Sequence, residues 1–127
     1  MSLSSLEAVG QAVDVYFRAL HACDMTLFDQ VFHPCASLFD STGGAFTAMP
    51  IAVYREIVAH RRSPLSAGQP RDDELISVDF LSPDAAVAKV RLRLHEHVFV
   101  DHLNFLRIDG RFMIAAKVWH EEMPRGV

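Results

Sequence analysis

The stretch from residue 98 to residue 120 constrains the fold of this chain more than any other part of its sequence. It reads VFVDHLNFLRIDGRFMIAAKVWH, two apolar runs on either side of Asp109 and Gly110. Asp-Gly between such runs predicts a tight β-hairpin, because both central turn positions need a positive φ that these residues tolerate. Apolar residues occupy both faces of the predicted strands, so we expect both faces to be covered.

Polar side chains interrupt the apolar surface of this hairpin at His102, Asn104 and His120. In the first strand, His102 and Asn104 share one face with Val100 and Leu106. A polar group that is buried needs a hydrogen-bond partner, and a site that offers none is a candidate cavity. The pattern therefore predicts that His102 and Asn104 face inward and line a pocket.

The rest of the chain predicts three helices and four further strands. The helices are expected at residues 1–22, 26–32 (with Asp24 as N-cap) and 51–62, the short strands at 36–41 and 45–47, and the long strands at 74–81 and 85–94. A chain of 127 residues buries roughly two thirds of its unfolded surface, which suits one domain spanning residues 1–127. The order predicts an α+β fold in which four long antiparallel strands follow the helices.

Composition and charge exclude several classes of protein. The chain is 50% hydrophobic and 22% charged, as soluble globular proteins are. It has neither a basic start followed by an apolar run nor an apolar stretch of about 20 residues, so we expect no secretory signal and no membrane contact. A net charge of −4 without a basic stripe argues against nucleic acid. Its two cysteines lack CxxC spacing, which indicates reduced thiols and a cytoplasmic location.

Four segments carry a resemblance to a known superfamily. They are YFRALHACD (16–24), FHPCASLF (32–39), FTAMPIAVYREIV (46–58) and FVDHLNFLRIDGRFMIAAKVWH (99–120). They resemble the nuclear transport factor 2-like superfamily, which includes ketosteroid isomerase, scytalone dehydratase and SnoaL-like polyketide cyclases, and within it most resemble the small bacterial proteins called putative lumazine-binding. The resemblance implies a cone-shaped, cystatin-like roll, in which three N-terminal helices pack in the concave face of a strongly curved, mixed, mainly antiparallel sheet.

The resemblance to ketosteroid isomerases also implies three catalytic residues. Tyr16 stands in their Tyr-x-x-Ala-Leu-x-x-x-Asp context, Asp40 stands where their general base precedes a glycine, and Asn104 replaces their protonated aspartic acid. Tyr16 and Asn104 would donate hydrogen bonds to an enolate oxygen, while Asp40 moves a proton. Each residue also has a structural explanation, since a tyrosine can lie in the core, an aspartate can accept turn amides and an asparagine can bind a buried water.

The histidines offer a second candidate for acid–base chemistry. A His33–Asp40 or His102–Asp79 pair would correspond to the acid and base of the dehydratase relatives. A zinc site needs three or four converging ligands. The predicted strand faces do not bring the histidines together, so we expect neither a metal nor a cofactor.

These observations leave three functions open. The first is binding of a small, hydrophobic, cyclic metabolite; the second is a cofactor-independent isomerase, dehydratase or cyclase with Asp40 or His33 as base; the third is a dimeric interaction module that binds no ligand. A cavity below the volume of a few waters would exclude the first two. The expected pocket residues are Tyr16, Phe17, Phe32, His33, Asp40, Tyr54, His102, Asn104 and Trp119.

The strands also predict how copies of the chain associate. We expect a large apolar outer sheet face and a homodimer formed through it. The residues assigned to this face include Phe99, Phe105, Ala86, Ala88, Val90 and Val118.

Overall fold

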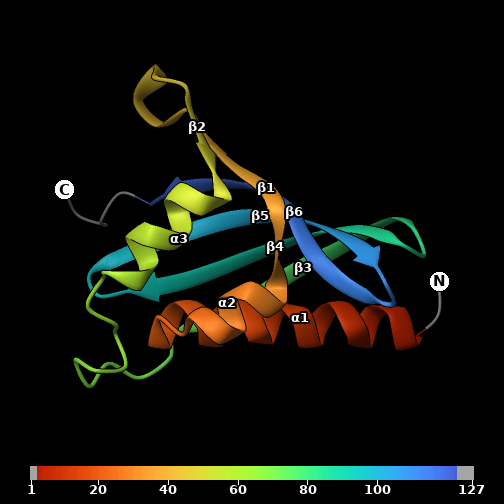
Figure 1. Ribbon diagram of the computed structural model, residues 1–127, viewed down its shortest axis with the longest axis horizontal. Helices are drawn as coiled ribbons and strands as arrows, with labels where there is room; N and C mark the ends of the chain where they lie inside the picture. The colour runs from red at the N-terminus through yellow and green to blue at the C-terminus, as the bar shows by residue number, and fades with distance from the viewer. Residues whose placement is uncertain (1–2, 123–127) are drawn as a thin grey trace.

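The computed structural model describes residues 3–122, which form three α-helices and one six-stranded mixed sheet (Figure 1). The elements are α1 (Leu3–Ala22), α2 (Met25–Val31), β1 (Phe32–Asp40), β2 (Thr47–Pro50), α3 (Ile51–Ala59), β3 (Asp73–Ser82), β4 (Ala85–Leu94), β5 (His97–Ile108) and β6 (Arg111–Glu121), with a short 3-10 turn η1 (Thr42–Gly44). The strand order is β2-β1-β6-β5-β4-β3, and only β1 and β6 are parallel. The predicted α+β class is confirmed.

The hairpin that the sequence predicts at Asp109-Gly110 is present. Strands β5 and β6 pair antiparallel from Phe99↔Glu121 to Ile108↔Arg111, and both turn residues have positive φ, 51° for Asp109 and 84° for Gly110. A positive φ at both central positions gives the turn a twist that matches that of the flanking strands.

The helices cover one face of the sheet. The apolar stripe of α1, formed by Val9, Val13, Tyr16 and Leu20, is at most 2% exposed. Figure 1 shows α2 beside α1 below the sheet and α3 nearer to β1. The predicted N-cap of α2 is confirmed, because the Asp24 carboxylate accepts hydrogen bonds from the backbone N–H groups of Thr26 and Leu27.

Some predicted boundaries are wrong. Strand β1 starts at Phe32 rather than at residue 36, so Pro34 lies inside a strand. The pairing of β1 with β6 is interrupted between Phe32 and Ser37, and an interrupted ladder tolerates a proline that has no N–H to donate. Helix α3 ends at Ala59, three residues before its predicted end at residue 62.

The two faces of β5 are the reverse of the predicted ones. Asp101, Leu103 and Phe105 are at most 1% exposed and lie on the inner face, whereas His102 and Asn104 are exposed on the outer face. The physical reason is that both faces of this strand carry apolar residues, so alternation alone does not distinguish inside from outside.

The outer face of the sheet is therefore not the apolar surface that the sequence predicts. Phe105, Ala86, Ala88 and Val90 are buried on the helix side of the sheet. The exposed apolar side chains on the outer face of the paired strands β5 and β6 include Leu106 and Val118, at 44% and 46% exposure. His102 and Asn104 lie among them, so this face is mixed.

A β-bulge in β6 determines which of its residues face inward. Asn104 pairs with Ala116 while Phe105 pairs with Ile114, which leaves Ala115 as an extra residue. Residues three apart in a regular strand lie on opposite faces. Because of the bulge, Ile114 and Lys117 both point inward and are 0% and 5% exposed.

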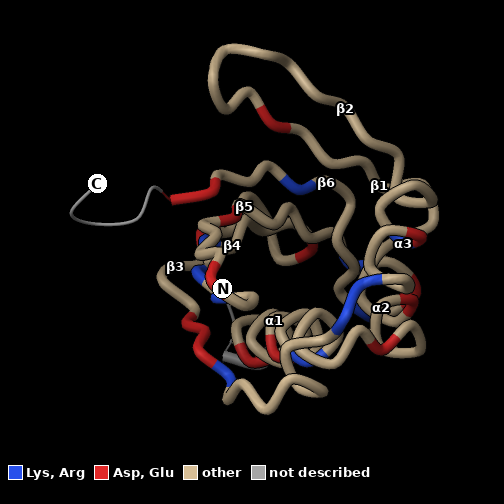
Figure 2. Tube along the Cα trace, turned by 90° about the vertical axis from the view of Figure 1, so that its left-hand side faces the viewer, with Lys and Arg blue, Asp and Glu red and all other residues tan. Residues whose placement is uncertain are grey.

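Strands β1 and β2 form a hairpin that projects from the body of the molecule, as Figures 1 and 2 both show. Asp40 is the last residue of β1, beyond the last pair with β6 (Phe39↔Val118), and it is paired with Thr47. Near the tip, the rings of Phe39 and Phe46 stack with centroids 6.4 Å apart, although Phe46 is 75% exposed. The hairpin therefore carries Asp40 away from the helices.

Candidate functional site

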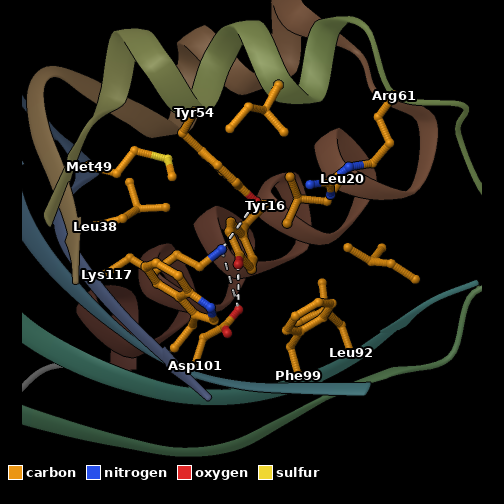
Figure 3. Close-up of a pocket in the computed structure, with 13 residues that line it drawn as sticks. Tyr16, Leu20, Leu38, Met49, Tyr54, Arg61, Leu92, Phe99, Asp101 and Lys117 are labelled. Carbon is orange, nitrogen blue, oxygen red and sulfur yellow. Dashed lines mark hydrogen bonds and ion pairs between the residues drawn. The ribbon is translucent and has the colours of Figure 1, made fainter. Parts of the chain in front are cut away.

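A cavity of about 160 Å³ lies between the inner face of the sheet, α1 and α3. Most of its wall is apolar; the polar groups of Tyr16, Asp101 and Lys117 gather at one place, and Arg61 enters from another side (Figure 3). The lining residues are Tyr16, Leu20, Leu38, Met49, Tyr54, Ile57, Arg61, Leu92, Leu94, Phe99, Asp101, Lys117 and Trp119. Apolar walls with a few convergent polar groups are typical of small-molecule sites.

Tyr16 and Asp101 form a buried hydrogen bond in the wall of this cavity. The Tyr16 hydroxyl donates to Asp101 Oδ2 at 2.5 Å, and the two residues are 0% and 1% exposed. Burial, and then the negative charge of Asp101, raise the pKa of Tyr16 well above its usual value. Tyr16 therefore stays a neutral donor and holds one oxygen of Asp101 in place.

Lys117 supplies the positive charge beside this carboxylate. Strand pairing sets Leu103 opposite Lys117 and Asp101 opposite Trp119, so Asp101 and Lys117 are diagonal neighbours on the inner face. Lys117 Nζ lies 3.8 Å from Asp101 Oδ2 and donates to the Tyr54 hydroxyl at 3.2 Å. It also lies 4.7 Å from the centre of the Tyr54 ring, within the range of a cation–π contact.

Among the described residues, the second oxygen of Asp101 has no hydrogen-bond partner. Asp101 Oδ1 is buried and accepts no hydrogen bond from the described residues. A buried acceptor without a donor costs about 1–3 kcal/mol, more when it is charged. Asp101 itself lines the cavity, so a bound molecule that reaches its buried Oδ1 with an N–H or O–H group would supply the missing donor.

The structure brings three of the nine predicted pocket residues together. Tyr16, Tyr54 and Trp119 all line the cavity. Phe17 and Phe32 do not line it; they are 5% and 3% exposed and pack against Tyr16 in the aromatic core. That these two phenylalanines contact a ligand stays a prediction.

The other four predicted pocket residues lie outside the cavity. Asp40 accepts hydrogen bonds from Thr42 N and Thr42 Oγ1 at 3.1 and 2.6 Å, so its carboxylate stabilises the turn after β1. His33 Nδ1 accepts from the backbone N–H of Cys35 at 3.0 Å. His102 and Asn104 are exposed on the outer face.

Asp40 and Asn104 consequently do not converge with Tyr16. The oxyanion pair predicted for Tyr16 and Asn104 is not formed, because Asn104 faces away from the helices. The penultimate strand does place an acidic group beside Tyr16, but this group is Asp101, three residues earlier. Neither predicted acid–base pair, His33–Asp40 or His102–Asp79, is joined by a hydrogen bond among the described residues.

Sequence reasoning missed Asp101, Lys117 and Arg61. One signal pointed to Asp101: it lies on the same strand face as Phe99, Leu103 and Phe105, and this is the face of the hairpin with the bulkiest apolar residues. Lys117 gave no such signal, since its inward direction depends on the bulge at Ala115. Arg61 lies beyond the end of α3 and reaches the cavity only through the packing of that helix.

Residues 3–122 contain neither a candidate metal cluster nor a helix that could span a membrane. No cluster of three or more histidine, cysteine, aspartate or glutamate side chains in this part of the chain is arranged to hold a metal ion. Among the helices described, none has the length and apolar character needed to cross a bilayer.

The comparisons with solved structures identify the fold class. An NTF2-like protein of unknown function from Shewanella baltica OS155 is 18% identical, with a TM-score of 0.84 and 98% of each chain covered. One from Silicibacter pomeroyi DSS-3 is 20% identical, with a TM-score of 0.83 over 96% of this chain and 100% of the other. A ketosteroid isomerase-like protein from Erwinia carotovora atroseptica SCRI1043 is 14% identical, with a TM-score of 0.73 over 97% and 100%. The chain therefore has the nuclear transport factor 2-like fold.

The family follows from the sequence. The model of the family described as "Putative lumazine-binding" matches residues 4–120, and the chain belongs to this family. No curated protein matches the chain. The predicted nuclear transport factor 2-like fold and the predicted branch are both confirmed.

Proposed function

We propose that this protein binds a small cyclic metabolite in the cavity, with an N–H or O–H group of the ligand donating to Asp101 Oδ1. The observation that carries the proposal is the unpartnered Oδ1 of a carboxylate that is 1% exposed and lines a mainly apolar cavity. Trp119 and Tyr54 supply aromatic surface beside it. Lys117 Nζ is available as a donor next to this acceptor.

The size of the cavity limits the ligand. A water needs about 10–15 Å³ of such space, and a cavity of about 150 Å³ accommodates benzene. The cavity of about 160 Å³ therefore holds far more than a few waters, which argues against the interaction module without a ligand. It has room for one ring, so a bicyclic molecule would extend through the opening and a four-ring steroid would not fit.

The family description agrees with this class of ligand without selecting one member. Lumazines are planar rings that carry N–H donors beside carbonyl acceptors, which complement Asp101 Oδ1 and Lys117 Nζ. The isomerase-type alternative has less support, because the proposed base Asp40 is hydrogen-bonded to Thr42 outside the cavity. Ligand binding is therefore the function that the site supports best.

A thermal-shift titration with phenol, indole and lumazine tests the proposal. A ligand at 100 times its Kd adds about 2.7 kcal/mol, which raises Tm by several degrees. We expect a shift in the wild type and a loss of affinity of tenfold or more in Asp101→Asn, since the amide offers an N–H where the ligand also presents a donor. Asp40→Asn is the matched control and is expected to bind normally. Equal binding by both variants would contradict the assignment to Asp101.

We also propose that two copies of the chain pair through the outer sheet face. Leu106 and Val118 lie on neighbouring strands there and are 44% and 46% exposed, and a twofold contact would cover both. Sedimentation equilibrium is expected to give the mass of a dimer for the wild type and of a monomer for Val118→Lys. A wild-type monomer at micromolar concentration would rule this interface out.

A further inference from the structure

Arg61 is a partly buried cation that lines the cavity and has no anionic partner in the part of the chain that the structure describes. It lies two residues beyond the end of α3, where its backbone N–H bonds to Val58 O, and its side chain lines the cavity. Figure 3 shows this side chain reaching toward Leu20 and Tyr16. Within residues 3–122 it makes no side-chain hydrogen bond or ion pair, whereas Arg55 and Arg71 each pair with an aspartate.

The guanidinium nitrogens of Arg61 are not fully buried and pair with no carboxylate of the described residues. They are therefore free to pair with an anionic group of a molecule bound in the cavity that Arg61 lines. The positive charge of Arg61 is also felt inside the cavity, since it partly offsets the rise in the pKa of Tyr16. The charge of Arg61 therefore affects the part of the cavity that contains Tyr16 and Asp101.

The charges that line the cavity do not balance. Lys117 and Asp101 are neighbours of opposite sign, and Arg61 adds one positive charge that no lining residue compensates. The chain as a whole has a net charge of −4, so a positive cavity runs against its overall charge. An anion of single charge is the ligand that restores the balance.

We propose that the natural ligand is a cyclic or aromatic carboxylate, whose carboxylate pairs with Arg61 at the open end while its N–H or O–H group binds Asp101. The planar fork of a guanidinium matches a carboxylate with two parallel hydrogen bonds. A phosphate ester carries close to two charges at neutral pH, and one unpaired arginine does not neutralise it. This inference rests on the proposed function and adds the charge of the ligand to it.

Isothermal titration with matched phenols tests this inference. The acids are 4-hydroxybenzoate, 4-hydroxyphenylacetate and 4-hydroxyphenylpropionate, which place the carboxylate at increasing distances from the hydroxyl. The neutral counterparts are p-cresol, 4-ethylphenol and 4-propylphenol. In the wild type we expect at least one acid to bind tenfold or more tightly than its neutral counterpart. Arg61→Gln is expected to remove that preference without weakening the binding of the neutral phenols.

Arg62→Gln is the control, because Arg62 is an exposed arginine next to Arg61 that does not line the cavity. It is expected to keep the preference for the acid. Acids that bind no better than the neutral phenols would overturn the inference and leave the proposed function standing. A preference that survives in Arg61→Gln would do the same. Failure of every phenol and every acid to bind the wild type would overturn the proposed function as well.

Discussion

Replacing Asp101 with alanine is expected to lower the free energy of unfolding by about 3–5 kcal/mol, the range found when one partner of a buried ion pair is removed. The substitution leaves the Tyr16 hydroxyl without its acceptor and leaves Lys117, which is 5% exposed, without its anionic neighbour. Urea denaturation of the wild type and the variant measures the difference.

A double variant separates the charge from the packing. Asp101→Leu combined with Lys117→Met removes both charges and keeps apolar volume, and such replacements are often neutral or stabilising. We expect the double variant to be more stable than Asp101→Ala, although the Tyr16 hydroxyl still lacks its acceptor. If the double variant were the less stable of the two, the pair would not be the cause of the loss.

Replacing Phe32 with alanine is expected to cost about 3–5 kcal/mol, as large cavities in aromatic cores do. Phe32 is 3% exposed, and its ring lies 4.5 Å from that of Phe28 and 5.8 Å from that of Tyr16, measured between centroids. The loss of stability comes from core packing and not from a lost ligand contact, because Phe32 does not line the cavity. Thermal and chemical denaturation without ligand measure it.

Phe46 provides the control for this prediction. It is 75% exposed at the tip of the β1–β2 hairpin, so Phe46→Ala is expected to change stability by about 0.5 kcal/mol or less. A Phe32→Ala protein of wild-type stability with impaired ligand binding would instead support the sequence-based prediction that Phe32 contacts the ligand.

The sequence predicted elements well because local chemistry determines them. The Asp109-Gly110 turn and the Asp24 cap depend on the conformations and hydrogen bonds of a few adjacent residues. The apolar stripe that carries Tyr16 repeats at helical spacing and could be followed directly. These features need no knowledge of the rest of the fold.

The composition of the site was harder to predict because it depends on which face of each strand turns inward. His102 and Asn104 occupy the same face as several apolar residues of β5, and only the packing of the helices against the other face of the sheet distinguishes the two. A choice that is wrong by one residue exchanges the whole inward set. Asn104 was thus assigned to the pocket, whereas Asp101 occupies it.

The bulge at Ala115 allows the two ends of β6 to change independently. On the side near the turn, Phe112 and Ile114 belong to the core, while beyond the bulge Lys117 and Trp119 line the cavity. The pairing of β1 with β6 is interrupted alongside it, between Phe32 and Ser37. Substitutions at Trp119, beyond the bulge, would therefore alter the cavity while the packing of Phe112 and Ile114 stays in place.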